Sequence, residues 1–145
     1  MEARDDMVVM MEPQWQRLWE KSAIGRRLDN GGLHLLPEEV IFCYHHRHQT
    51  LPTDEWIQLN LNMDTDLEAR FLILEALRVP GNLIILTKHH HCSKWQIEAK
   101  SWALRWHKES HPDNTEPTAE IRWHYSSDVI DWSELLNWTT GVINN

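Results

Sequence analysis

The sequence predicts an α/β fold of the α+β type, in which a small helical N-terminal region precedes a mixed, mainly antiparallel sheet packed on a central helix. Apolar residues recur at helical spacing up to Val79, and the period then changes to two, which is typical of strands with one buried face. A chain of 145 residues is long enough to bury a sizeable core. The change of pattern predicts a flexible arm (residues 1–12), a helical region (residues 13–63) and an α/β region (residues 64–145).

The helical region is expected to contain three short elements. Gln14 to Lys21 carries apolar residues at helical spacing and is interpreted as a short helix or an extended segment. A turn at residues 29–32 and a short apolar run lead to Pro37, which predicts a helix start because proline suits the first helical position. A further short helix, capped by Thr53, is expected to run through Trp56 and Leu59 toward Leu61. The helix from Pro37 is expected to turn four side chains toward the core: Val40, Ile41, Tyr44 and His48.

The α/β region opens with the strongest helix signal in the chain. Residues 65–68 match a capping box, and a helix from Asp66 to Val79 follows. This helix is apolar over so much of its surface that it is predicted to lie centrally. Pro80 and Gly81 end it, and a continuous apolar strand is expected at residues 82–87.

Alternating patterns after residue 87 predict antiparallel strands, and a helix or turn is expected from Asp131 to Trp138. A proline-containing loop at residues 111–117 separates two of the strands. The side chains expected on the buried faces fall into three sets: Trp95, Ile97 and Ala99; Trp102, Leu104 and Trp106; and Ile121, Trp123 and Tyr125.

Composition argues against several classes of function. There are 14 basic and 22 acidic residues, a formal charge of −8, whereas a free-standing nucleic-acid binder is usually basic. No apolar run approaches the length of a membrane span. Two cysteines form no disulfide framework and suit a reducing compartment, so a nuclear or cytoplasmic location is expected.

Two histidine-rich segments are candidate metal sites, because zinc is bound by four cysteine or histidine ligands. The first comprises Cys43, His45, His46 and His48, and the second comprises residues 89–92. Neither has the paired spacing of a zinc finger, and neither places all its members on one face of a helix or strand. We therefore expect no metal and no cofactor, and a small His/Cys metal-binding protein remains an alternative.

Acid–base chemistry is also weakly supported, so the chain is not expected to be an enzyme by itself. His124 adjoins Tyr125, but neighbouring residues of a strand point to opposite faces, and Tyr125 falls on the apolar face and is expected in the core. Lys108 and His111 lie in the preceding segment. The adjacent carboxylates Glu38 and Glu39 are accounted for by the positive end of a helix dipole.

Nine tryptophans are the outlying feature of the composition, and tryptophan is enriched in protein interfaces. Most are expected in or near the core, with two or three left for a partner. A base-stacking platform is less favoured, because Arg105 and Arg122 alternate with the tryptophans and would project from the other face. The candidate partner-binding residues are Trp95, Trp102, Trp106, Trp123, Trp132 and Trp138.

A short motif carries a resemblance to a known family. Gly25 precedes a leucine-rich stretch that runs into Leu35, Leu36, Pro37, Glu38 and Glu39 and then an apolar helix. This pattern resembles the non-catalytic, fifty-four type subunit of the tRNA-splicing endonuclease. The order of elements matches more loosely over residues 14–138. Two departures are the replacement of a glycine-containing stretch by residues 89–92 and the absence of the C-terminal pairing strand.

The resemblance implies a structural subunit without catalytic residues. Catalytic subunits of that enzyme use tyrosine, histidine and lysine in chain order, and no lysine follows Lys108 here. The implied partners are the other endonuclease subunits, with pre-tRNA met only through the complex and no membrane involved. An acidic interaction adaptor with exposed tryptophans is the alternative left open by the residues themselves.

Overall fold

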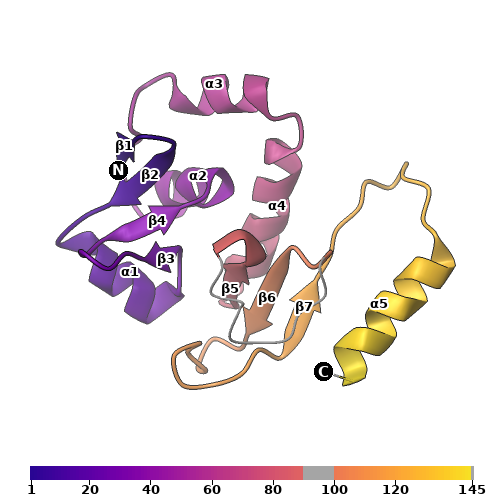
Figure 1. Cartoon of the computed structure of the whole chain (residues 1–145). Helices are drawn as coiled ribbons and strands as arrows, with labels where there is room; N and C mark the ends of the chain where they lie inside the picture. The colour runs from indigo at the N-terminus through magenta and orange to yellow at the C-terminus, as the bar shows by residue number, and fades with distance from the viewer. Residues whose placement is uncertain (90–99, 145) are drawn as a thin grey trace.

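The computed structural model describes residues 1–89 and 100–144 and has an α+β fold, as the sequence predicts. Two antiparallel sheets and four helices form the body, and a fifth helix stands beside it (Figure 1). One cluster of buried residues joins the parts of the body. It includes Leu33 and Leu35 of the first sheet together with Ile84 and Leu104 of the second.

The first sheet is formed by β1 (Glu2–Arg4), β2 (Met7–Met10), β3 (Arg26–Arg27) and β4 (Leu33–Leu35) in the order β1-β2-β4-β3. Val8 pairs with Leu35, and Met10 pairs with Leu33. The prediction of a flexible arm at residues 1–12 is therefore wrong. Val8, Val9 and Met10 are buried, because they pair with a strand that lies far along the chain. The N-terminal region is accordingly not purely helical.

Helix α1 (Gln14–Ser22) lies where a helix or extended segment is expected, and α2 (Pro37–His46) begins at the predicted proline. Val40 and Ile41 are buried as expected. The expectation is wrong for Tyr44, which is 44% exposed, and for His48, which is exposed. The reason in the second case is that α2 ends at His46, before His48 can share its buried face.

Helix α3 (Trp56–Met63) and helix α4 (Leu67–Arg78) follow, and α4 packs between α2 and the second sheet. The helix predicted at residues 66–79 is thus confirmed. The capping box is not formed, because no side chain caps the first turn of α4. The apolar face is also narrower than expected, since Leu72 is 51% exposed.

The second sheet has the order β5-β6-β7, with β5 (Leu83–Leu86), β6 (Ala103–Trp106) and β7 (Ala119–Ile121). Every residue of β5 is buried. Strand β7 ends at Ile121, so Trp123 and Tyr125 lie beyond it. Tyr125 is 41% exposed, which contradicts its predicted core position. The strand expected around Trp95 lies outside the described residues.

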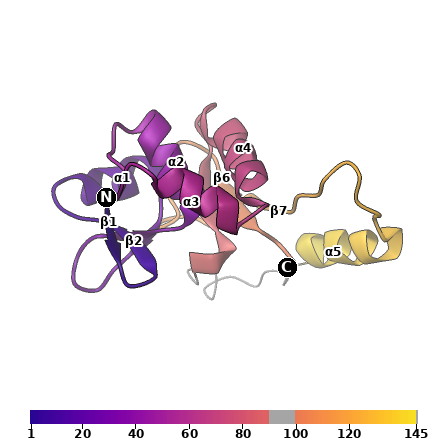
Figure 2. The ribbon, with the colours of Figure 1, turned by 90° about the horizontal axis from the view of Figure 1, so that it is seen from above.

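The last element, α5 (Trp132–Asn144), begins where the sequence predicts a helix or turn. Asp131 caps it, because its Oδ1 accepts hydrogen bonds from the backbone N–H groups of Ser133 and Glu134 at 3.0 and 3.2 Å. Two perpendicular views place α5 to one side of the body (Figures 1 and 2). None of the described helices is long and apolar enough to cross a membrane.

Candidate partner interface and its framework

Glu39 is the centre of a buried network that holds together the first sheet, α2 and η1 (Thr87–His89), the 3₁₀ helix after β5. Proline at the first position of α2 places Glu39 in the first turn, where its carboxylate reaches back toward the backbone. Its Oε1 accepts the N–H of Leu36 at 2.9 Å, and its Oε2 accepts the N–H of Gly25 at 2.9 Å. The His89 Nε2 donates to Oε1 at 2.5 Å, and both of these side chains are buried.

The ionised form of Glu39 is stabilised by this network. Burial by itself would raise the pKa of the carboxyl group. The charge and hydrogen bond of His89, the Leu36 N–H and the charge of Arg78 outweigh it, so the pKa lies below the ordinary value of 4.5. A buried carboxylate that is ionised and hydrogen-bonded in this way contributes to stability at neutral pH.

Gly25 lies against the neighbouring strand in a conformation that suits only glycine. Its φ is +81°, and a Cβ atom would come within 2.7 Å of the His34 carbonyl oxygen and 2.9 Å of a Leu35 methyl group. Both the backbone conformation and the available space therefore exclude a side chain. The close approach is what brings the Gly25 N–H to Glu39.

Arg78 supplies a second buried connection. Its guanidinium donates to the carbonyl oxygens of Ser22, Ala23 and Ile84 at 2.7, 3.2 and 2.5 Å. Burial lowers its pKa to about 10, against the opposing effect of Glu39. This arginine satisfies carbonyl groups at the end of α1 and in β5 that would otherwise be buried without donors.

The remaining motif residues have structural positions as well. Leu35 is in the core, Leu36 precedes α2, and Pro37 begins it. Glu38 is buried and accepts a hydrogen bond from Arg70 Nε at 2.5 Å. These motif residues thus connect elements of the fold, and no local pattern indicated that His89, Arg70 and Arg78 would be their partners.

The six candidate tryptophans have different environments. Trp106 is fully buried, so its assignment to a partner surface is wrong. Trp95 lies outside the described residues. Trp102 and Trp123 are half-buried, Trp102 against the core and Trp123 with its ring 5.3 Å from that of Tyr125.

Trp132 and Trp138 lie on different faces of α5. Trp138 is half-buried and its indole N–H donates to Ser101 Oγ at 2.9 Å. One turn earlier, Glu134 forms ion pairs with Lys100 and, at 3.3 Å, with Arg122. Trp132 is 69% exposed. The face with Trp138 and Glu134 therefore points toward the second sheet, and these polar contacts hold the helix near it.

The opposite face of α5 is apolar and open. Trp132 and Leu136 are one turn apart, and they are 69% and 65% exposed. Helix α5 packs along none of the described helices or strands. The preceding segment is tied to the body at Tyr125, whose hydroxyl donates to Asp66 Oδ1 at 2.8 Å. The helix is thus attached at a few points and presents two large apolar side chains to solvent.

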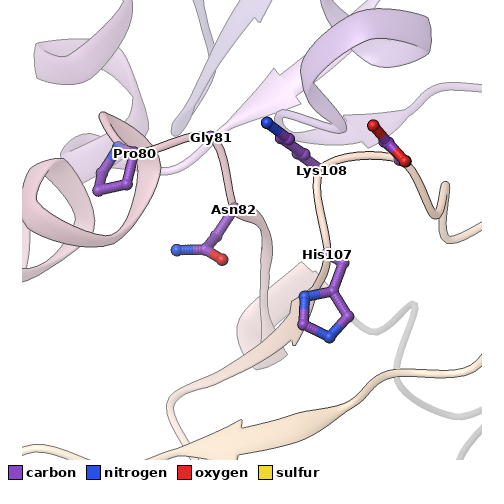
Figure 3. A pocket seen from close by; sticks show the side chains of 6 residues that line it. Pro80, Gly81, Asn82, His107 and Lys108 are labelled. Carbon is purple, nitrogen blue, oxygen red and sulfur yellow. The ribbon is translucent and has the colours of Figure 1, made fainter.

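The residues considered for acid–base chemistry have partners in different places. Tyr125 bonds to Asp66 as above, and His111 Nε2 donates to the Trp19 carbonyl at 2.8 Å. Lys108 lies at a pocket of about 380 Å³ between the turn before β5 and the end of β6 (Figure 3). In that view the side chains of Lys108 and His107 point in different directions. These contacts give no convergent set of acid and base.

The described side chains of the two histidine-rich segments also lie in separate environments. Cys43 is buried, and burial raises the pKa of its thiol to about 12. His46 Nε2 donates to Glu75 at 2.7 Å, and His45 is exposed. Among residues 1–89 and 100–144 no three potential ligands gather around a common point. Residues 90–92 of the second segment lie outside the described residues.

The chain matches no protein-family model, no curated protein and no solved structure.

Proposed function

We propose that this chain is a non-catalytic structural subunit that binds a partner through α5, and that the assembly it serves is the tRNA-splicing endonuclease. The observation that carries the binding role is the open face of α5, with Trp132 69% exposed and Leu136 65% exposed. Pre-tRNA is met through the complex, in the nucleus or the cytoplasm.

Physical chemistry favours partner binding at this face. An exposed tryptophan is costly to leave in water, and burying it in a partner's pocket is the typical source of a binding hot spot. A helix that presents residues one turn apart is suited to a hydrophobic groove on another protein. The few polar contacts of α5 with the sheet leave this face available for that purpose.

The endonuclease assignment rests on the resemblance at Gly25 and residues 35–39. The structural roles of these residues support a shared framework, because Glu39 needs both the glycine and the helix start to form its hydrogen bonds. Catalysis belongs to a partner in this proposal. The excess of acidic residues in this chain agrees with partners that supply most of the phosphate contacts.

The test is affinity purification of the tagged full chain from its native cells, with mass spectrometry and a pre-tRNA cleavage assay. The wild-type chain is expected to recover endonuclease subunits and cleavage activity. The double variant Trp132→Ala/Leu136→Ala is expected to lose both, since truncating a hot-spot tryptophan costs about 2 kcal/mol or more. Leu59→Ala, which truncates a 57% exposed leucine on α3, is the matched control.

The alternative is an adaptor for an unrelated complex, and the same experiment separates the two. Recovery of other proteins, lost in the α5 double variant, would establish the adaptor and exclude the endonuclease. A partner set that is unchanged in the double variant would refute the role of α5.

A further inference from the structure

A second surface feature lies on the body, away from α5. A cleft of about 590 Å³ opens between one face of α1 and the residues at the end of α2. The lining residues of α1 recur at intervals of one turn, as expected for one side of a helix. The charged or titratable side chains among the lining residues are Arg17, Lys21, His46, Arg47 and His48.

The charge of this cleft is opposite to that of the chain. The protein has a formal charge of −8, yet three permanent cations line the cleft and none of its lining residues is a carboxylate. Arg17 and Lys21 are exposed, and neither forms a hydrogen bond or an ion pair within the described part of the chain. Their charges are therefore available to a ligand.

Negative charges near the cleft offset only part of this positive charge. The C-terminal ends of α1 and α2 lie at the cleft, and each carries roughly half a negative charge from the helix dipole. The Glu75 carboxylate lies next to His46 at 2.7 Å and offsets that side chain when it is protonated. Even when the Glu75 carboxylate is counted in full beside the two partial charges, the three cations leave the cleft with a net positive charge.

One of the cations is held in place by the fold. Arg47 donates to the His46 carbonyl at 2.9 Å and to Ser22 Oγ at 3.3 Å. Its guanidinium also lies over the Phe42 ring, with Cζ 5.1 Å from the ring centroid. The guanidinium is thus positioned before a ligand arrives, which lowers the entropy cost of binding.

We infer that this cleft binds phosphate groups. The preordered guanidinium of Arg47 lines the cleft together with Arg17 and Lys21, which are one turn apart on α1. This set of cationic donors is suited to charge-assisted hydrogen bonds with phosphate oxygens. The phosphates could belong to a free polyphosphate or to the backbone of a single-stranded RNA, because both present the same oxygens. The inference does not depend on the proposed endonuclease function.

The test measures binding of two probes to the purified full chain at low salt. One probe is inorganic tripolyphosphate, followed by calorimetry, and the other is a fluorescently labelled uridine dodecamer, followed by anisotropy. Arg17→Ala/Lys21→Ala removes the two unpaired cations of the cleft. The control Arg4→Ala/Lys108→Ala also removes two exposed cations and changes the net charge equally. Thermal unfolding monitored by circular dichroism establishes that both variants are folded.

The cleft variant is expected to bind its probe roughly tenfold more weakly or worse than the wild type, while the control stays within about threefold. Binding of tripolyphosphate with this pattern identifies a free phosphate ligand. Binding of the dodecamer alone with this pattern identifies an RNA backbone. Failure of the wild-type chain to bind either probe, or equal losses in the two variants, overturns the inference. Copurification plays no part in this assay, so its outcome is separate from the test of the partner role.

Discussion

Replacing Glu39 by glutamine tests whether the buried network at the start of α2 holds the fold together. The carboxylate accepts hydrogen bonds from the N–H groups of Gly25 and Leu36 and from His89. Glutamine offers one acceptor oxygen and one NH₂ group. In the less costly orientation, the NH₂ group faces the Gly25 N–H and leaves this buried donor unsatisfied. In either orientation the substitution removes the negative charge.

The size of the effect follows from these losses. An unsatisfied buried donor costs about 1–3 kcal/mol, and breaking a buried charge pair costs about 3–5 kcal/mol in total. A protein of this size is stabilised by roughly 5–15 kcal/mol, so the variant should remain folded but be strongly destabilised. With a slope of about 2 kcal/mol per molar urea, the unfolding midpoint is expected to fall by about 2 M.

Urea titration followed by tryptophan fluorescence measures this shift. Glu116→Gln is the matched control, because Glu116 is exposed and has no hydrogen-bond or ion-pair partner within residues 1–89 and 100–144. Its midpoint is expected to stay within about 0.3 M of the wild type, as for most surface substitutions. A Glu39→Gln midpoint as close to the wild type as that would refute the role assigned to the carboxylate.

The pH dependence of the same titration gives an independent check. The pKa of Glu39 in the folded chain is below its ordinary value of 4.5, so the contribution of its carboxylate to the free energy of unfolding is fully present above pH 4.5. The contribution is lost as pH falls through the folded-state pKa. The difference in free energy of unfolding between wild type and Glu39→Gln should therefore be constant near neutral pH and shrink below about pH 4.5. A difference that stays constant down to acid unfolding would show that the carboxylate is not ionised in the folded chain.

Three further predictions concern buried groups. Gly31→Ala should lower the free energy of unfolding by about 1 kcal/mol, because Gly31 has a φ of +90° but open space around it, whereas Gly25→Ala should lower it by at least about 3 kcal/mol, because its Cβ would also collide with the adjacent strand. Equal unfolding midpoints of the two variants in urea would refute the steric argument. In a Cys92→Ser variant, Cys43 should resist alkylation by iodoacetamide at pH 8 in the folded chain and react in concentrated urea, because its thiol is buried. Mass spectrometry measures the alkylation, and rapid reaction of the folded chain would contradict the burial of Cys43. Arg78→Met should lower the free energy of unfolding by about 3–5 kcal/mol. Arg78→Lys should lower it by less, because lysine keeps the charge and some donors for the three carbonyl groups. Calorimetric unfolding that ranks the two variants in the reverse order would refute this account.

Local patterns were sufficient to predict most of the elements. Pro37 marks the start of α2, Pro80 and Gly81 follow α4, and the continuous apolar run becomes β5. These signals act within a few residues, through fixed proline geometry and side-chain periodicity. The same local logic was wrong at the N-terminus, because the first hairpin is stabilised by pairing with β4.

The candidate partner surface shows the same limit. Composition singled out tryptophan and put Trp106 and Trp132 in one set of candidates. Trp106 is fully buried, as the strand period predicts, whereas Trp132 is 69% exposed. Exposure depends on what packs against a residue, which a local pattern does not contain. The cleft between α1 and α2 also combines residues from two separate segments, so its charge was not apparent from the sequence.

The sequence by itself determined the α+β class, the start of α2 and the acidic charge, because each depends on composition or on neighbours along the chain. The tertiary structure decided that Glu39 meets His89 and Gly25, that Arg78 joins α1 to β5, and that α5 presents Trp132 to solvent. Such contacts form between residues far apart in the chain. They are selected by the burial of the whole core and the need to satisfy every buried polar group, and neither condition can be evaluated one segment at a time.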